Sequence, residues 1–203
     1  MTKPLIYLIT EGNLTAEKFD GEKKRVLEII KAAVKNKISL IQIREKKLAA
    51  KLVFELTAEA AKITKNSNTR LLVNDRPDIA RAANADGVHL TENSVSAAII
   101  RRSFPKNFIV GVSTHSIETA EKAKTESADF VTFSPVFSSP GKGAPVGLEK
   151  LAEVCAKLKP FPVIALGGID KTNYKSVLEK GASGFAAIRF FNKILSDGQN
   201  RER

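Results

Sequence analysis

The sequence predicts a (β/α)8 barrel of the TIM-barrel class, formed by a single domain that spans residues 1–203. Short apolar runs rich in β-branched residues alternate with longer segments whose apolar residues recur at helical spacing. There are eight such runs, and most are continuously apolar, as expected for parallel strands buried on both faces. A chain of 203 residues is near the lower limit for this fold, and its apolar fraction of 43% is enough for a core.

The predicted strands follow one another at similar intervals along the chain. They are Leu5–Thr10, Leu40–Arg44, Leu71–Asp75, Gly87–Leu90, Phe108–Thr114, Phe130–Val136, Pro162–Ile169 and Gly184–Phe191. The helical segments between them are residues 23–36, 49–65, 77–83, 94–104, 116–126, 147–158 and 172–180. Because each helix connects two strands, the strands should run parallel, and eight such units favour a closed barrel. Only residues 192–203 follow the last strand, so the last helix should be short or frayed.

The composition limits the classes of partner. The net charge of +11 is spread through helical segments and interleaved with Glu, which is typical of solvated helix faces rather than of a nucleic-acid surface. There is no Trp, there are two Tyr, and the chain has neither an 18-residue apolar run nor a signal-peptide pattern, so a cytoplasmic protein is expected. The one cysteine, Cys155, lies in a helical pattern and is expected to be a small buried hydrophobic residue.

Functional residues of such barrels lie where the strands end at their carboxyl side, and these ends are polar here. The second strand ends in Gln42, Arg44 and Lys46, which alternate along the chain and should therefore share one side. An amide and two cations at a barrel mouth suit a diphosphate or triphosphate. The alternative is a surface salt-bridge cluster that includes Glu45.

The third strand ends in Asn74 and Asp75. A carboxylate opposite cations would repel phosphate, and Mg²⁺ bound by Asp75 would remove this conflict, because Mg²⁺ binds one or two carboxylates together with phosphate oxygens. The alternative is that Asp75 or Asp78 caps the following helix. The sequence leaves these two interpretations open.

The fifth strand ends in a run of four polar residues. Ser113 is expected to face the mouth, whereas Ser116 resembles the cap of the next helix. His115 could act as a base but has no evident partner in the sequence, so a structural role is favoured. His89 lies within an apolar run and is expected to be packed in the interior.

Two further segments are candidates for phosphate binding. The loop at residues 138–145 combines hydroxyls, glycines and Lys142, and it could close over a ligand. Gly167 and Gly168 end the seventh strand, and the eighth runs into Ile188 and Arg189. The ends of strands seven and eight form the commonest phosphate site of this fold.

The chain resembles the thiamine phosphate synthases and the related thiazole tautomerases over nearly its whole length. The motifs that carry the resemblance are QIREK, NDRPDIA, ADGVHL, GVSTHS, ADFVTFSPVF and PVIALGGI. The resemblance implies a transferase of thiamine biosynthesis. In its reaction a pyrimidinylmethyl diphosphate loses pyrophosphate, and the ring nitrogen of a thiazole phosphate attacks the resulting carbocation-like centre.

The resemblance also assigns site residues. It implies that the pyrimidine diphosphate binds Gln42, Arg44, Lys46, Asn74 and Lys142. The thiazole phosphate would bind Ser139, Gly141, Gly168, Ile188 and Arg189. Asp75 would hold Mg²⁺ as the cofactor, and Ser113 would contact the pyrimidine. Arg44, Lys46, Lys142 and Ser113 are the predicted catalytic residues, since the barrier lies in charge that develops on departing pyrophosphate.

The chain also departs from the family pattern. The second acidic metal ligand of the synthases corresponds to Ser94, and a serine is usual where Arg189 stands. The catalytic His of the tautomerases corresponds to Pro135. The alternatives are therefore a thiazole phosphate tautomerase-like isomerase and a non-catalytic barrel that binds phosphate ligands or nucleic acid. Small phosphorylated substrates are the expected partners, with no nucleic acid or membrane, and a homodimer is one state that the sequence leaves open.

Overall fold

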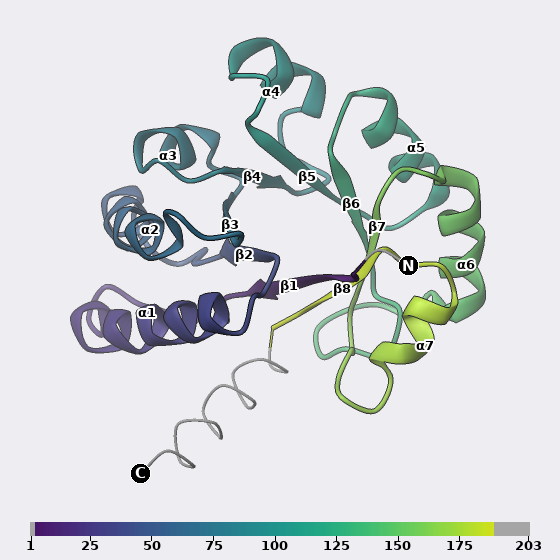
Figure 1. Cartoon of the computed structure of the whole chain (residues 1–203), viewed down its shortest axis with the longest axis horizontal. Coiled ribbons are helices and arrows are strands. Elements are labelled where there is room, and N and C mark those ends of the chain that lie inside the picture. Colours follow the sequence, from purple (N-terminus) through teal and green to yellow (C-terminus); the bar gives the residue numbers. More distant parts are fainter. Residues whose placement is uncertain (1–2, 189–203) are drawn as a thin grey trace. The chain divides into compact units, whose positions relative to one another are not determined.

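A computed structural model describes residues 3–188 of the chain (Figure 1). Its strands follow one another in the closed barrel order β1 to β8, which confirms the predicted α/β barrel class. The strands are β1 (Leu5–Ile9), β2 (Leu40–Ile43), β3 (Arg70–Asn74), β4 (Gly87–Leu90), β5 (Ile109–Thr114), β6 (Phe130–Phe133), β7 (Val163–Leu166) and β8 (Gly184–Ala187). The helices are α1 (Phe19–Lys35), α2 (Ala50–Thr64), α3 (Pro77–Ala82), α4 (Ala97–Ser103), α5 (Ile117–Thr125), α6 (Gly147–Leu158) and α7 (Tyr174–Glu179).

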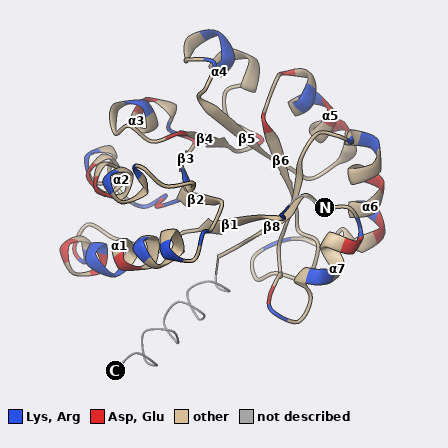
Figure 2. Ribbon diagram, viewed as in Figure 1, with Lys and Arg blue, Asp and Glu red and all other residues tan. Residues whose placement is uncertain are grey.

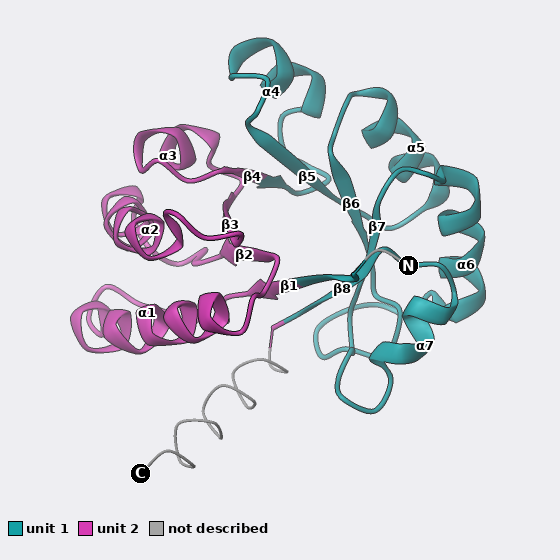
Figure 3. Cartoon of the chain, viewed as in Figure 1, with its two compact units in different colours: residues 1–6, 89–187 teal, residues 7–88, 188–203 magenta. Residues whose placement is uncertain are grey.

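The chain divides into two compact units (Figure 3). Among the described residues, unit 1 comprises 3–6 and 89–187, and unit 2 comprises 7–88 with Ile188. In unit 2, β2 pairs in parallel with β1 and with β3. In unit 1, β6 pairs in parallel with β5 and with β7, which in turn pairs with β8.

Several strands end earlier than predicted, and backbone chemistry explains why. β6 ends at Phe133, because Pro135 has no N–H to continue the ladder. β7 ends at Leu166, because the next residue, Gly167, has φ +99° and leaves the extended conformation. The predicted residues 189–191 of the eighth strand lie outside the described residues, as does the predicted short last helix.

The helices agree with prediction within a few residues, except that α1 begins four residues earlier. Its first turn contains Asp20 and Glu22, whose negative charge is favourable at a helix amino terminus, and Phe19 is buried there. α5 begins with the predicted cap: the Ser116 hydroxyl accepts a hydrogen bond from Thr119 N in a reciprocal capping box. The expected position of Ser116 at the helix start is confirmed.

The core is formed by strand residues and by the inward faces of the helices. Cys155 is buried, as expected, and burial raises the pKa of its thiol to about 11. Most helices carry both Lys or Arg and Asp or Glu (Figure 2), in agreement with solvated helix faces, whereas α4 carries only Arg101 and Arg102. Within residues 3–188 no helix is long and apolar enough to cross a membrane. The single-domain extent of 1–203 stays a prediction.

Candidate active site

In unit 2 the polar end of β2 contains three of the predicted site residues. Gln42 is 1% exposed, and its Nε2 donates to the Tyr7 hydroxyl at 2.8 Å. Burial raises the pKa of the Tyr7 phenol, so it stays protonated at neutral pH. Arg44 is half-buried just beyond the strand, and its backbone N–H donates to Thr10 Oγ1 at 2.8 Å. Lys46 is exposed in the turn that follows, where strand alternation no longer applies.

The buried side chain of Glu45 stabilises the loop next to the end of β2. Its side chain is 5% exposed, and its carboxylate accepts backbone hydrogen bonds from Gly12 N at 3.3 Å and from Leu14 N at 3.1 Å. Both carboxylate oxygens are therefore used by the loop between β1 and α1. The alternative of a surface salt-bridge cluster around Glu45 is wrong, because this carboxylate is buried and bonded to backbone.

Gly12 allows the loop to pass close to Arg44. A Cβ atom at Gly12 would lie 2.8 Å from the Arg44 carbonyl oxygen and 3.2 Å from Arg44 Nη1. The φ of Gly12 is +76°, a conformation that other residues rarely adopt. The loop backbone and the guanidinium are thus in close packing, and the guanidinium is confined on that side.

The end of β3 presents Asn74 and Asp75, both half-buried. Asn74 Nδ2 donates to Asp75 Oδ2 at 2.9 Å, which orients the carboxylate. Asp75 has a φ of +54°, a left-handed conformation that is uncommon outside glycine and concentrated at functional sites. A strained carboxylate held by its neighbour is consistent with a ligand position.

The capping alternative for this segment stays a prediction. The N-cap residue of α3 is Arg76, whose side chain makes no capping hydrogen bond to the first turn. Asp78 instead pairs with the Arg76 guanidinium through two contacts, Nε to Oδ1 at 2.9 Å and Nη2 to Oδ2 at 2.5 Å. This pairing lowers the pKa of Asp78. The Asp78 carboxylate also accepts a hydrogen bond from the backbone of Ile79 in the first turn of the helix.

In unit 1 the polar end of β5 is organised by a buried histidine. His89 is 2% exposed, as expected for a packed residue, and its Nε2 lies 3.0 Å from Ser113 Oγ and 3.5 Å from Thr132 Oγ1. Gly111 makes room for this ring, because a Cβ there would lie 2.8 Å from His89 Nδ1. Ser113 is half-buried, and its hydroxyl is positioned by the imidazole.

His115 is exposed, and its Nδ1 lies 2.7 Å from the Ser134 carbonyl oxygen. A carbonyl can only accept, so Nδ1 carries the proton and donates this bond. The contact supports the favoured structural role: His115 ties the end of β5 to the segment after β6.

Residues 138–145 of the loop after β6 are exposed, apart from half-buried Ser139. Lys142 N donates to the Ser139 carbonyl oxygen at 3.1 Å, and Gly141, with φ +72°, completes this turn. A Cβ at Gly141 would meet no atom within 4 Å, so the turn is open on that side. The predicted loop residues Ser139, Gly141 and Lys142 therefore lie together in one accessible turn.

Gly167 and Gly168 have a packing role in the structure. A Cβ at Gly167 would lie 2.6 Å from Pro135 Cα, and one at Gly168 would lie 2.5 Å from the Ser138 carbonyl oxygen. Backbone hydrogen bonds reinforce this approach, since Phe137 N donates to the Gly167 carbonyl oxygen at 3.0 Å. The two glycines let the loop after β6 pack directly on the end of β7.

Ser94 is engaged locally. Its hydroxyl lies 3.0 Å from Thr91 Oγ1 and accepts from Thr91 N at 3.0 Å. A hollow of about 170 Å³ in unit 1 is lined by residues that include Ser94, Ser113 and Glu92. In residues 3–188 no three acidic, histidine or cysteine side chains cluster as a metal site. Ile188 is half-buried, whereas Arg189 lies outside the described residues.

Sequence reasoning missed Gly12, the buried role of Glu45, and the contact of His89 with Ser113. The two contacts join residues 33 and 24 positions apart, respectively. A glycine after a strand and a carboxylate among cations were visible signals, but only the fold brings the partners together.

Comparisons with known proteins identify the family of the chain. The family model for thiamine monophosphate synthase matches residues 6–191. A thiamine-phosphate synthase of Syntrophomonas wolfei is 37% identical over 186 residues, which cover 90% of this chain and 86% of that protein. One of Caldicellulosiruptor bescii is 36% identical over 178 residues, covering 86% and 80%. The solved thiamine phosphate pyrophosphorylase of Pyrococcus furiosus is 28% identical with a TM-score of 0.78, covering 97% of this chain and 94% of its own.

Proposed function

The chain belongs to the thiamine monophosphate synthase family, and from this premise we propose that it joins a pyrimidinylmethyl diphosphate to a thiazole phosphate and releases pyrophosphate. The predicted family, and with it the transferase class, is confirmed. The observation that carries the proposal furthest is the end of β2 and β3 in unit 2. There a confined guanidinium, an exposed lysine and an oriented carboxylate are all present.

The proposed reaction breaks one bond and forms another. The bond between the pyrimidine methylene carbon and the diphosphate oxygen breaks, and its electron pair leaves with pyrophosphate. The lone pair of the thiazole ring nitrogen then forms the new carbon–nitrogen bond. Arg44, Lys46 and Lys142 stabilise the charge that develops on the departing pyrophosphate. Electrostatic stabilisation of this kind is usually the largest single contribution to lowering the barrier of such a step.

The remaining roles are proposed from chemistry and position. Gln42 and Asn74 bind the pyrimidine diphosphate through their amides. Ser113 contacts the pyrimidine, and His89 keeps its hydroxyl in one orientation. Ser139, Gly141, Gly168 and Ile188, with Arg189, bind the thiazole phosphate. The open turn at Ser139–Lys142 offers backbone N–H groups and a cation to a phosphate.

Mg²⁺ is the proposed cofactor, held by Asp75. The donor set fits weakly without substrate, because Asp75 is one oriented carboxylate and the Ser94 hydroxyl is occupied by Thr91. Oxygens of the diphosphate and water would complete the six ligands that Mg²⁺ requires. When bound, the metal neutralises charge on the leaving group. We therefore expect Mg²⁺ to bind appreciably only together with the diphosphate.

The direct test is product formation from both purified substrates with and without Mg²⁺. We expect thiamine phosphate and pyrophosphate in equal amounts, both dependent on the two substrates and on the metal. Conversion of a thiazole phosphate isomer without the pyrimidine substrate would instead support the tautomerase alternative, which Ser94 favours. Failure to form thiamine phosphate from the two substrates and Mg²⁺ would contradict the proposal.

Arg189 gives a second test of the thiazole phosphate site. A guanidinium can bind a phosphate through two hydrogen bonds, but it is also much larger than serine. Calorimetric titration with thiazole phosphate distinguishes the two effects. Binding that weakens in Arg189→Ser supports a contact with the phosphate, whereas binding that appears only in Arg189→Ser shows that the arginine fills the pocket.

A cytoplasmic location and a homodimer remain part of the proposal.

A further inference from the structure

Unit 2 contains a cavity of about 670 Å³, which lies at the opposite end of β3 from Asn74. Its lining comes from α2, α3 and the loops that lead into β3 and β4. Arg70 is the first residue of β3 and Asn74 the last, so the two are separated by about 13 Å at ~3.3 Å per residue. The cavity is within the usual size range of small-molecule sites, and it shares no lining residue with the candidate active site.

The charge of this cavity is unbalanced. Its lining includes three cations, Lys62, Lys65 and Arg70, but one carboxylate, Asp86. Within the described part of the chain, Lys62 and Lys65 form no ion pair. The lining therefore has a surplus of two positive charges, which matches the charge of a phosphomonoester dianion.

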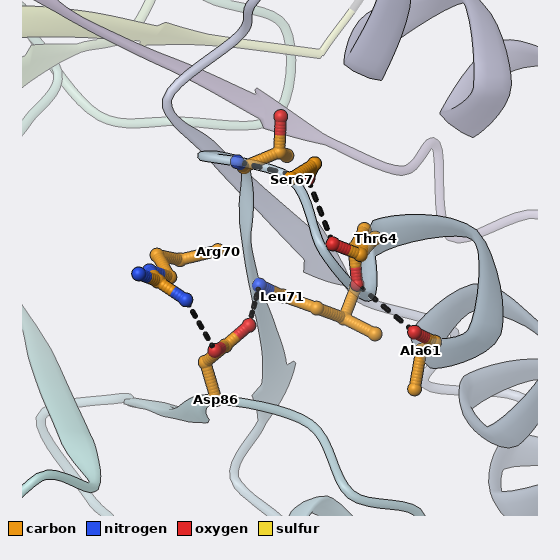
Figure 4. Close-up of polar contacts among 7 residues, drawn as sticks. Ala61, Thr64, Ser67, Arg70, Leu71 and Asp86 are labelled. Atoms are coloured by element: carbon orange, nitrogen blue, oxygen red, sulfur yellow. Dashed lines mark hydrogen bonds and ion pairs between the residues drawn. The ribbon is translucent and has the colours of Figure 1, made fainter.

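Asp86 is already satisfied and holds Arg70 in place. One of its oxygens accepts from Arg70 Nη1 at 3.2 Å, and the other accepts from Leu71 N at 2.8 Å (Figure 4). The carboxylate is thus fixed by the strand backbone, and it anchors one edge of the guanidinium. The other guanidinium N–H groups remain as donors. A guanidinium anchored in this way loses little freedom when it binds an anion.

The lining of the cavity also contains apolar side chains. Phe54 lines it with 41% of its surface exposed, which is high for a phenylalanine. Four alanines contribute methyl groups to the same lining: Ala58, Ala61, Ala82 and Ala83. An exposed aromatic ring offers a face on which a planar group can stack.

We propose that this cavity binds a small aromatic phosphomonoester, with the phosphate on Lys62, Lys65 and Arg70 and the ring on Phe54. The site is separate from the synthase reaction, so it can take a ligand while the active site is working. Neither the proposed catalysis nor the family assignment requires it.

Calorimetric titration of the full chain with phenyl phosphate tests the proposal. We expect phenyl phosphate to bind at least tenfold more tightly than inorganic phosphate or phenol, because inorganic phosphate lacks the ring and phenol lacks the phosphate. Lys62→Gln combined with Lys65→Gln should raise the Kd at least tenfold. Lys51→Gln, an exposed lysine on the same helix outside the cavity, should leave it unchanged. Phe54→Ala should weaken phenyl phosphate and leave inorganic phosphate unaffected.

A second background separates this cavity from the active site. In a chain with Arg44→Ala and Lys142→Ala, phenyl phosphate should bind as in the unmodified protein. Synthase activity of the Lys62→Gln, Lys65→Gln variant should be normal. If phenyl phosphate no longer binds to the Arg44→Ala, Lys142→Ala protein but still binds to the Lys62→Gln, Lys65→Gln protein, the ligand is in the active site and the proposal is overturned. Equal affinity for phenyl phosphate and inorganic phosphate would overturn the role of Phe54, and undetectable binding at millimolar concentration would overturn the site.

Discussion

In unit 2 the segments that carry the candidate site residues are held by side-chain hydrogen bonds, whereas in unit 1 the loop at residues 138–145 is mostly exposed and closed by one turn. The buried Glu45 carboxylate fixes the loop between β1 and α1, and Asn74 orients Asp75. By contrast, the turn at Ser139–Lys142 has open space around Gly141.

This difference indicates a division of labour. A diphosphate needs its cations and metal ligand at fixed positions, because electrostatic stabilisation is strongest when the groups do not have to reorganise. A loop that admits a substrate must be able to move, and loops with few buried contacts open at low cost. Gly167 and Gly168 anchor the base of that loop, so its mobility should be confined to residues 138–145.

The largest effect is expected at the base of the loop. Gly168→Ala should destabilise the protein by roughly 3–5 kcal/mol, because it combines a left-handed φ of +64° with a Cβ placed 2.5 Å from the Ser138 carbonyl oxygen. Gly141→Ala is the matched control, with a similar φ of +72° but no atom within 4 Å. Urea unfolding of both variants measures the difference. Equal destabilisation would show that the loop is not packed against Gly168.

The next effect concerns catalysis in unit 2. Arg44→Ala should lower kcat/KM by about 10- to 150-fold, which corresponds to the ~1.5–3 kcal/mol of a charge-assisted hydrogen bond. Its melting temperature should change little, because the half-buried side chain leaves no core cavity. Lys47→Ala, an exposed neighbour, is the control. Normal steady-state kinetics in a folded Arg44→Ala protein would remove this residue from the site.

A smaller effect, on the free energy of unfolding, is expected at the buried carboxylate of Glu45. Glu45→Gln should cost roughly 1–3 kcal/mol of unfolding free energy, because a neutral amide has one oxygen where two backbone N–H groups need acceptors. The exposed residue Glu92 provides the control, and Glu92→Gln should stay within about 0.5 kcal/mol of the unmodified protein. Chemical denaturation of the pair tests this, and an unchanged Glu45→Gln would mean that the carboxylate does not hold the loop.

The smallest effect concerns Cys155, away from both regions. Its thiol pKa of about 11 means that little thiolate exists at pH 8, so modification by Ellman's reagent should be slow in the folded protein and fast after unfolding. The folded-state pKa lies above the unfolded value of about 8.5, so stability should fall as pH rises through this interval. Fast labelling of native protein at pH 8 would contradict the burial of this residue.

The sequence predicted the order and type of the strands and helices that lie within residues 3–188, because hydrophobic periodicity is a local signal. The ends of the elements were predicted less accurately than their order. β6 ends before Pro135, and α1 begins before the predicted residue 23 because Phe19 is buried in the core. These ends depend on backbone donors and on tertiary burial, which a local pattern does not contain.

The candidate site was predicted in its residue types but not in its connections. The strand-end positions of Arg44 and Asp75 followed from fold class and polarity. The bonds of Glu45 to the loop at Gly12, and of His89 to Ser113, join segments that only the folded chain brings together. The same holds for the packing of Gly168 against the loop after β6, which the sequence did not predict.

The most direct test of the account is the Mg²⁺ dependence of product formation in Asp75→Asn. Asparagine tolerates the left-handed backbone and matches the size of aspartate, so the fold should be unaffected and only the charge is lost. We expect at least a tenfold drop in activity at saturating substrates, partly recovered by raising Mg²⁺. Asp78→Asn, which breaks only the exposed pair with Arg76, should keep full activity. Unchanged Mg²⁺ dependence in Asp75→Asn would contradict the proposal that Asp75 holds the metal with the diphosphate.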